Sequence, residues 1–463
     1  MNYLGIDYQI KNHPVLDPDY IPFGSWSQAF LKEASRPISI AVERNSNQVS
    51  VFHSFIRDEH YAEANARYVE RLVKFLLWSI GGHRIYIAGC DQYAQTLKSA
   101  YQMHGARAFD ADFMNTVFER PLEIVITDFE HFPEANEITR PIGGHLNGCR
   151  IGFDAGGSDR KVSAVIDGQT VFSEEVVWFP KLQSDPKYHH DGVYEAMKTA
   201  ASHMPRVDAI GVSSAGVYVD NKIMIGSLFL KVSDEDFEKH IKHMYTDIAK
   251  ELSAEYGKEI PIEVANDGDV TALAGAMDLN DNNVLGVAMG TSEAGGYVDG
   301  NGNITGWLNE LAFVPVDFCE NAMVDEWSGD YGCGVKYFSQ DGVIKLAPLA
   351  GIELDEKLSP AEKLKVVQNL MKEGDERAKK IYENIGVYFG YEIAFYTEFF
   401  DIKHVLIMGR VTSGEGGVLL LNKAQEVLDK EFPEIAKKLE LHIPDESSRR
   451  VGQSVAAASL PNA

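Results

Sequence analysis

The stretch CRIGFDAGGSDRKVSAVIDGQTVFSEEVV, residues 149–177, decides the fold. Its three runs of apolar and β-branched residues are separated by the glycine turn 156–158 and by Asp167-Gly168. Asp-Gly between two such runs is a hairpin signal, and paired glycines let a backbone approach a ligand closely. The stretch therefore predicts three successive strands, and the first turn can offer backbone N–H groups to an anion.

Two later segments repeat parts of this plan. AMGTSEAGGYV, residues 288–298, is a strand that breaks at Gly290-Thr291-Ser292 and continues as a second strand with paired glycines. VLIMGRVTSGEGG, residues 405–417, is a strand that ends at Gly409. Two glycine-rich hairpins can hold a polyphosphate, and a glycine at a strand end lets a flat purine lie against the backbone.

The elements around these segments define the fold class. From residue 149 onwards strands and helices alternate in two successive blocks, which predicts an α/β protein with two lobes. The preceding region reads as a hairpin, a long helix and a strand–helix–strand unit, without a chemical motif, and the polar, glycine-rich residues 133–148 read as a linker. We therefore expect an accessory α/β domain over 1–147, a first lobe over 148–265 to which a terminal helix over 449–463 returns, and a second lobe over 266–448.

Composition excludes several classes of function. The 463 residues carry a net charge of -26, which argues against a nucleic-acid partner. The longest apolar run, residues 72–80, is too short to span a membrane and contains Lys74, and the N-terminus lacks a signal-peptide pattern. The four cysteines are scattered without metal-ligand spacing, so we expect a cytoplasmic protein in a reducing compartment.

A candidate catalytic group lies in EVANDGDVTALAGA, residues 263–276. Here Asn266 and Asp267 stand between a short buried strand and a helix. A carboxylate can accept the proton of a hydroxyl during phosphoryl transfer, and an amide can orient neighbouring hydroxyls. Taken alone, the same residues also fit a loop turn with solvated acids.

The order and spacing of these motifs resemble the sugar-kinase/actin-like ATPase superfamily and, within it, the ROK family of repressors and sugar kinases. The resemblance covers roughly two thirds of the chain, from residue 149 to the end. The segment 154–158 resembles the first phosphate motif of the family, and 290–296 is similar to the second. GVSSAGVYVD, residues 211–220, resembles a family strand end, and Gly409 lies where the adenosine motif would be.

The resemblance implies a two-lobed actin-like ATPase (ribonuclease H-like) core with an interlobe cleft, preceded by the accessory domain. It implies ATP-dependent phosphorylation of a hexose or related sugar; the alternative is a non-catalytic sugar sensor of the ROK type. Expected partners are the sugar, ATP and Mg²⁺, with no nucleic acid and no membrane, and the family resemblance allows a homodimer. The implied roles are a general base (Asp267), sugar contacts (Asn266, Glu310 and Gly216), nucleotide contacts (Gly156, Gly157, Ser158, Arg160, Gly290, Thr291, Ser292 and Gly409) and a Mg²⁺ position (Asp154).

Three residues depart from the family pattern. The family histidine three residues after Glu310 is Phe313 here, and the acid before Asn266 is Ala265. The cysteine-rich zinc loop is reduced to YGCGVKYF, which keeps Cys333 only. A closed zinc site needs about four ligands, so we expect the protein to carry no zinc, and the loss of the histidine leaves the identity of the sugar open.

Overall fold

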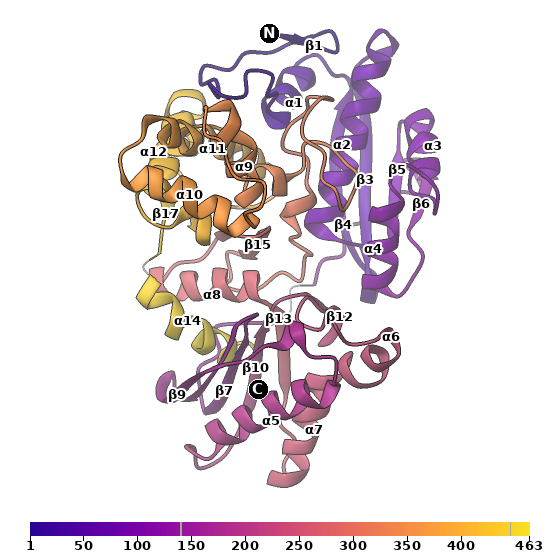
Figure 1. Ribbon diagram of the computed structural model, residues 1–463. Coiled ribbons are helices and arrows are strands. Elements are labelled where there is room, and N and C mark those ends of the chain that lie inside the picture. Colours follow the sequence, from indigo (N-terminus) through magenta and orange to yellow (C-terminus); the bar gives the residue numbers. More distant parts are fainter. Residues whose placement is uncertain (139–140, 445) are drawn as a thin grey trace. The chain divides into compact units, whose positions relative to one another are not determined.

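The computed structural model describes residues 1–138, 141–444 and 446–463. By contacts the chain divides into two compact units, which Figure 1 draws in sequence colours. Unit 1 comprises Met1–Ile138, Val287–Gly295 and Trp307–Ile443, and unit 2 comprises Thr139–Gly286, Gly296–Gly306 and Pro444–Ala463. Each unit is described by itself below.

Unit 2 is built on a mixed sheet of order β13-β10-β7-β8-β9, in which β7 pairs parallel to β10 and antiparallel to β8. A short hairpin, β11-β12, accompanies it. The strands are β7 (Cys149–Ala155), β8 (Asp159–Ile166), β9 (Gln169–Val177), β10 (Ala209–Ser214), β11 (Val217–Val219), β12 (Lys222–Ile225) and β13 (Ile262–Asn266). The helices are α5 (Pro186–Ala201), α6 (Asp234–Asp236), α7 (Met244–Tyr256), α8 (Asp267–Leu279) and α14 (Glu446–Ala458).

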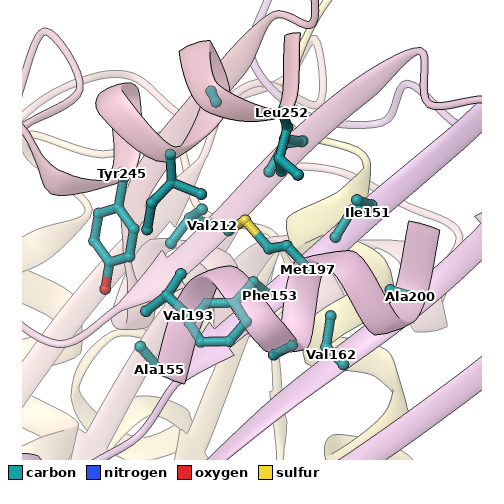
Figure 2. Close-up of a cluster of buried hydrophobic side chains, with 14 of the residues drawn as sticks. Ile151, Phe153, Ala155, Val162, Val193, Met197, Ala200, Val212, Tyr245 and Leu252 are labelled. Carbon is teal, nitrogen blue, oxygen red and sulfur yellow. The ribbon is translucent and has the colours of Figure 1, made fainter. Parts of the chain in front are cut away.

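One face of this sheet packs on α5 and α7. Alternate residues of a strand point to opposite faces, so Ile151, Phe153 and Ala155 of β7 share a face. Figure 2 shows these side chains packed with Met197 of α5 and Leu252 of α7. This apolar layer holds the sheet of unit 2 against its helices.

The other face of the sheet receives α14. Glycines allow the helix to approach: a Cβ on Gly152 of β7 would lie 1.8 Å from the carbonyl oxygen of Ser454, and one on Gly211 of β10 would lie 1.7 Å from that of Ala457. Ser163 and Ser454 join β8 to the helix through a 2.7 Å hydroxyl–hydroxyl hydrogen bond. The terminal helix is thus part of the packing of unit 2.

Unit 1 contains two larger sheets. The first has the order β4-β3-β5-β6, in which β3 pairs antiparallel to β4 and β5 and β5 pairs parallel to β6; the second has the order β15-β14-β16-β17. The strands are β1 (Asn2–Tyr3), β2 (Ile6–Asp7), β3 (Arg36–Arg44), β4 (Gln48–Ile56), β5 (Arg84–Ala88), β6 (Glu123–Thr127), β14 (Val284–Met289), β15 (Glu293–Val298), β16 (His404–Met408) and β17 (Glu440–His442). By contacts, the first half of β14 (284–286) and the second half of β15 (296–298) are assigned to unit 2. The helices are α1 (Phe23–Leu31), α2 (Ala62–Ile80), α3 (Asp91–Ala100), α4 (Ala108–Phe118), α9 (Gln340–Leu349), α10 (Pro360–Lys372), α11 (Glu376–Tyr396), α12 (Glu415–Glu431) and α13 (Pro433–Ala436).

Aromatic side chains join the N-terminal elements of unit 1 to its C-terminal ones. Phe23 of α1 and Phe75 of α2 contact Phe395 of α11, with ring centroids 5.2 and 4.8 Å apart. Phe75 also lies 4.2 Å from Phe399, which stacks on Phe52 of β4 at 5.1 Å. Aromatic pairs of this kind stabilise a fold by more than the burial of their surface alone. Through these contacts residues 1–138 and 307–443 share one core.

A buried ionic cluster joins the same two segments. Asp330 accepts from Arg71 Nη1 and Nη2 at 2.9 and 3.0 Å and lies 2.9 Å from Lys74 Nζ and 2.8 Å from Arg107 Nη1. Arg71 and Lys74 are inaccessible to solvent. Burial alone would raise the pKa of Asp330, but Lys74, Arg71 and Arg107 outweigh it and hold that pKa far below the ordinary range.

The domain boundaries expected from the sequence remain a prediction. Contacts group Met1–Ile138 of the expected accessory region with Trp307–Ile443, whereas residues 141–147 and α8 group with unit 2. Within the predicted linker over 133–148, residues 139–140 lie outside the described residues. Among the described residues, no helix combines the length and apolar character that crossing a membrane requires.

Candidate active site

The predicted site residues of unit 2 gather where parallel strands end. In the register of the sheet, Asp154 of β7 pairs with Ser213 of β10, and Ser214 pairs with Asn266 of β13. Ligands of open α/β sheets bind outside the carboxyl ends of the strands. The register therefore brings Asp154, Asn266 and Asp267 to one end of this sheet, although 113 residues separate Asp154 from Asp267.

Asp154 is buried at this end with polar neighbours. Its Oδ1 accepts a 2.9 Å hydrogen bond from Ser213 Oγ, and its Oδ2 lies 3.9 Å from Lys161 Nζ. Burial raises the pKa of Asp154 to about 6, and the nearby Lys161 and Ser213 oppose that rise. The negative charge of Asp267 also raises the pKa of Asp154.

Asn266 connects the start of α8 to the β10–β11 turn. Its Oδ1 accepts from the N–H of Gly268 at 2.7 Å, which makes it the N-cap of α8, and its Nδ2 donates to the carbonyl of Gly216 at 2.6 Å. Gly216 has φ +134°, and a Cβ there would lie 2.2 Å from the carbonyl oxygen of Ile225. Asn266 and Gly216, both predicted to serve the sugar, are therefore placed together by one hydrogen bond.

Asp267 is the first residue of α8 and is half-buried. Burial raises its pKa, while backbone N–H groups at the start of α8 and the charge of Lys181 oppose the rise. Burial increases the affinity of a carboxylate for a proton, whereas a helix N-terminus favours its charged form. These are the properties that a general base requires.

The predicted phosphate turn, Gly156-Gly157-Ser158, closes the β7–β8 hairpin. The N–H of Gly156 donates to the carbonyl of Asp159 at 3.0 Å, and a Cβ on Gly156 would lie 2.8 Å from that oxygen. At Gly157 a Cβ would meet the end of the Lys181 side chain at 3.2–3.3 Å. Lys181 thus brings a cation to the turn. The sequence pattern did not single it out, because it lies 23 residues beyond the motif.

The structure does not bring Arg160 to this group. Residues paired across an antiparallel ladder share a face, and Asp154 pairs with Lys161 whereas Ala155 pairs with Arg160. The Arg160 guanidinium accordingly lies on the α5 face, 5.8 Å from the centre of the Trp178 ring and against Gly192. Lys161, one residue further along β8, occupies the face of Asp154 instead.

The predicted site residues of unit 1 gather at one end of its second sheet. The N–H of Gly290 donates to the carbonyl of Ser292 at 2.9 Å, which closes a tight turn around Thr291. Gly409, at the end of β16, has φ +99°, and a Cβ there would lie 2.3 Å from the carbonyl oxygen of Met289. The second phosphate motif and the predicted adenosine glycine are therefore neighbours.

Glu310 lies in a loop that the end of α2 holds in place. The N–H groups of Leu308, Asn309 and Glu310 donate to the carbonyls of Ile80, Ser79 and Trp78 at 3.0, 2.9 and 3.1 Å. The last carbonyls of a helix lack partners within the helix. The loop satisfies them, and the half-buried Glu310 is positioned by the N-terminal region of the chain.

The model of the ROK family matches residues 150–454, about two thirds of the chain. The chain belongs to the ROK family. The matched range contains both glycine hairpins, Asn266-Asp267, Glu310 and Gly409, and leaves Met1–Ile138 of unit 1 outside. A comparison with curated protein sequences found no match.

Solved ROK structures share the fold at low identity. A ROK hexokinase from Thermus thermophilus is 18% identical, with 67% of this chain and 96% of that chain covered and a TM-score of 0.50. A ROK glucokinase from Streptomyces griseus, solved with glucose and AMPPNP, is 18% identical over 67% and 98% of the two chains, with a TM-score of 0.47. A ROK transcriptional regulator, homologous to the E. coli MLC protein, is 16% identical over 68% and 79%, with a TM-score of 0.49. The family model and the fold shared with the hexokinase confirm the predicted α/β class.

The departures from the ROK pattern have a physical context in unit 1. Phe313, at the position of the family histidine, packs on Trp78 of α2 with ring centroids 4.3 Å apart and also contacts Phe109 at 5.5 Å. Cys333 is buried beside the ionic cluster, with its Sγ 3.8 Å from Asp330, and burial raises the pKa of this thiol to about 12. The N-terminal region of this ROK protein therefore contacts Phe313, and it also contacts Asp330, the neighbour of Cys333.

A further carboxyl group lies close to Glu310. Glu293 follows the second phosphate motif directly and is buried, and both burial and the charge of Glu310 raise its pKa well above the ordinary range. Both causes favour the neutral form of the Glu293 carboxyl. The sequence analysis did not single out Glu293, because the residues around it give no sign that its side chain is buried.

Proposed function

We propose that this ROK protein is an ATP-dependent sugar kinase that phosphorylates a hexose or a related sugar, with Asp267 as the general base. The observation that supports this most is the arrangement at the end of the unit 2 sheet. There a half-buried carboxylate with a raised pKa follows an asparagine that is fixed by two hydrogen bonds.

In the proposed reaction Asp267 accepts the proton of the sugar hydroxyl. The hydroxyl oxygen forms a bond to the γ-phosphorus of ATP, the bond between that phosphorus and the β–γ bridging oxygen breaks, and ADP leaves. A sugar hydroxyl is a weak nucleophile, and a positioned base typically contributes about 10²–10⁴-fold to the rate. The raised pKa of Asp267 increases its affinity for that proton.

The remaining residues would bind and orient the two substrates. Asn266 keeps an N–H and a lone pair beyond its two hydrogen bonds, and Glu310 can accept from sugar hydroxyls. The turns at 156–158 and 290–292 would receive phosphate oxygens at their backbone N–H groups, and Gly409 would face the adenosine. Lys181 adds a positive charge at the first turn, in a chain whose net charge is -26.

The donor set at Asp154 fits Mg²⁺. Ser213 occupies one carboxylate oxygen, which leaves Oδ2 as a hard oxygen ligand, and Mg²⁺ in kinases is held by one or two carboxylates, phosphates and waters. When bound, the ion would neutralise charge on the phosphate oxygens. Asp154 would hold it, and Lys161 would offset the carboxylate charge while the site is empty of metal.

Single-turnover phosphoryl transfer with saturating Mg·ATP and a panel of hexoses tests the proposal. Asp267→Asn keeps the shape of the side chain and removes the proton acceptor, so transfer should fall by at least about 100-fold while sugar and ATP binding persist. The matched control is Asp278→Asn, at the exposed C-terminal end of the same helix, which should transfer phosphate at the wild-type rate.

Two outcomes would contradict the proposal. If Asp267→Asn transfers phosphate within a few-fold of wild type, another group is the base. If the wild-type protein binds a sugar tightly but transfers no phosphate to any of the panel, the protein is a sugar sensor, the alternative function considered from the sequence. Measuring sugar binding by calorimetry together with the phosphoryl-transfer rate distinguishes these two results.

A further inference from the structure

Three potential metal ligands converge on β16 and β17 of unit 1. His404 Nδ1 and His442 Nε2 are 3.0 Å apart, and Glu440 Oε2 lies 3.8 Å from His442 Nε2. One ligand atom from each of the three residues lies within 4.8 Å of the other two. None of these residues takes part in the proposed reaction.

The strand register explains the convergence. β16 and β17 pair in parallel, with His404 opposite Glu440 and Leu406 opposite His442. Glu440 and His442 are two residues apart on one strand, so their side chains share a face, and His404 lies on that face across the ladder. The His404 and His442 rings are half-buried whereas the Glu440 side chain is 75% exposed, so an ion can enter from solvent.

This group is separate from the glycines assigned to the nucleotide. His404 begins β16 and Gly409 follows its last residue, so at about 3.3 Å per residue the two ends are roughly 16 Å apart. The sequence predicted a protein without zinc, on the ground that the cysteine loop around Cys333 is reduced and Phe313 replaces the family histidine. A zinc-class site on β16 and β17 would overturn that prediction.

We propose that His404, Glu440 and His442 form a binding site for a divalent transition-metal ion of the Zn²⁺ class. Two imidazole nitrogens and a carboxylate suit Zn²⁺, Co²⁺, Ni²⁺ or Cu²⁺, whereas Mg²⁺ prefers oxygen ligands alone. Tetrahedral Zn²⁺ with bonds of about 2.0–2.1 Å places neighbouring ligand atoms roughly 3.4 Å apart. The observed separations of 3.0 and 3.8 Å lie on either side of this value.

A bound ion would link the edge strand β17 to β16. Its ligands come from both strands, and β17 is the last strand of unit 1, with His442 immediately before Ile443, the final residue of that unit. Binding to the folded state alone stabilises it in proportion to ln(1 + [ion]/Kd). A bound ion would therefore stabilise the pairing of β17 with β16 at the edge of this sheet. Water would fill the fourth coordination position of the ion.

The test is a titration of the chelator-treated full chain with Zn²⁺ alone, and with Mg²⁺ alone as the comparison ion. Calorimetry should show one Zn²⁺ equivalent that His404→Gln and His442→Gln each weaken by at least about 100-fold, because even outer partners of ligands are worth about 10–100-fold. Glu440→Gln, at an exposed position that does not threaten folding, should weaken binding by about tenfold or more. Co²⁺ should give the visible absorption of a tetrahedral site in wild type and lose it in His442→Gln.

His60→Gln is the matched control, since His60 is an exposed histidine of the same unit, and it should bind as wild type does. Cys333→Ser should also leave the affinity unchanged. The proposal is wrong if wild type takes up no Zn²⁺ at tens of micromolar, because the two histidines then share only a hydrogen bond. It is equally wrong if the Glu440 and His442 variants bind Zn²⁺ as tightly as wild type, because the ion then lies elsewhere.

Discussion

Asp330→Asn should destabilise unit 1 strongly. In the part of the chain that the structure describes, the ionic cluster around Asp330 balances three cations (Arg71, Lys74 and Arg107) with three carboxylates (Glu70, Asp110 and Asp330). The substitution leaves one buried positive charge without a counter-charge, while the shape of the side chain is nearly unchanged.

The size of the effect follows from burial. The side chains of Arg71 and Lys74 are 0% exposed, and those of Asp330 and Arg107 are 2% and 10% exposed, so solvent cannot screen the unpaired charge. Removing one partner of a buried pair typically costs about 3–5 kcal/mol. A second substitution, Lys74→Met, removes a cation from the Asp330→Asn protein and restores the charge balance, so it should recover at least half of the loss.

Urea unfolding followed by tryptophan fluorescence measures this cost. All proteins would carry Trp178→Phe, which removes the tryptophan of unit 2 and leaves the buried Trp26 and Trp78 to report on unit 1. Glu434→Gln, which breaks an exposed pair with Lys437, serves as the control. If Asp330→Asn shifts the unfolding free energy by less than about 1 kcal/mol, the value for a surface pair, the cluster does not stabilise this unit and the reasoning fails.

Three further predictions concern the site and the core. Glu310→Gln should raise the dissociation constant for the sugar while ATP-analogue binding stays unchanged; equal sugar affinity in calorimetry would assign Glu310 a structural role only. Gly157→Val should weaken ATP-analogue binding sharply without unfolding the protein, since a Cβ there meets only the mobile end of Lys181, and unchanged binding would mean that the turn does not contact phosphate. Burial raises the pKa of Asp317 to about 6, whereas its pKa in the unfolded chain is near 3.9. As the pH rises, Asp317 therefore loses its proton in the unfolded state first, which stabilises that state. The unfolding free energy of the wild type should consequently fall by roughly 2 kcal/mol from pH 4 to pH 7. Asp317→Asn should lack this component in urea titrations at the two pH values, and identical pH slopes would contradict the assignment.

Local sequence signals predicted the local structure well. Ser233 precedes three acidic residues, a pattern typical of a helix N-cap, and its side chain accepts from the N–H of Asp236 at 3.2 Å. The hairpin turn at 45–47, the end of α2 at Gly81 and the strand that stops at Asn266 also follow from neighbouring residues. Turns, caps and breaks are decided within a few residues, so a single sequence contains the information.

The contributions of distant residues could not be read in this way. Arg160 and Lys161 are both cations after the first glycine turn, and only the pairing register decides that Lys161 shares the face of Asp154. Phe313 read as a lost histidine, whereas its contact with Trp78 depends on packing between segments more than 200 residues apart. Such contacts depend on the register and tertiary packing, which residue spacing does not determine.

Unit 1 is assembled from distant parts of the chain, so its core cannot be completed until late in translation. Residues 1–138 share their core with residues 307–443, and the segment between them takes roughly ten to thirty seconds to synthesise at about 5–20 residues per second. During that interval four side chains of α2 lack the partners that residues 307–443 supply: Phe395 and Phe399 for Phe75, Phe313 for Trp78, and Asp330 for Arg71 and Lys74. Nascent chains of this protein should therefore expose apolar surface of α2, to which cellular chaperones bind, until Phe395 and Phe399 have been synthesised.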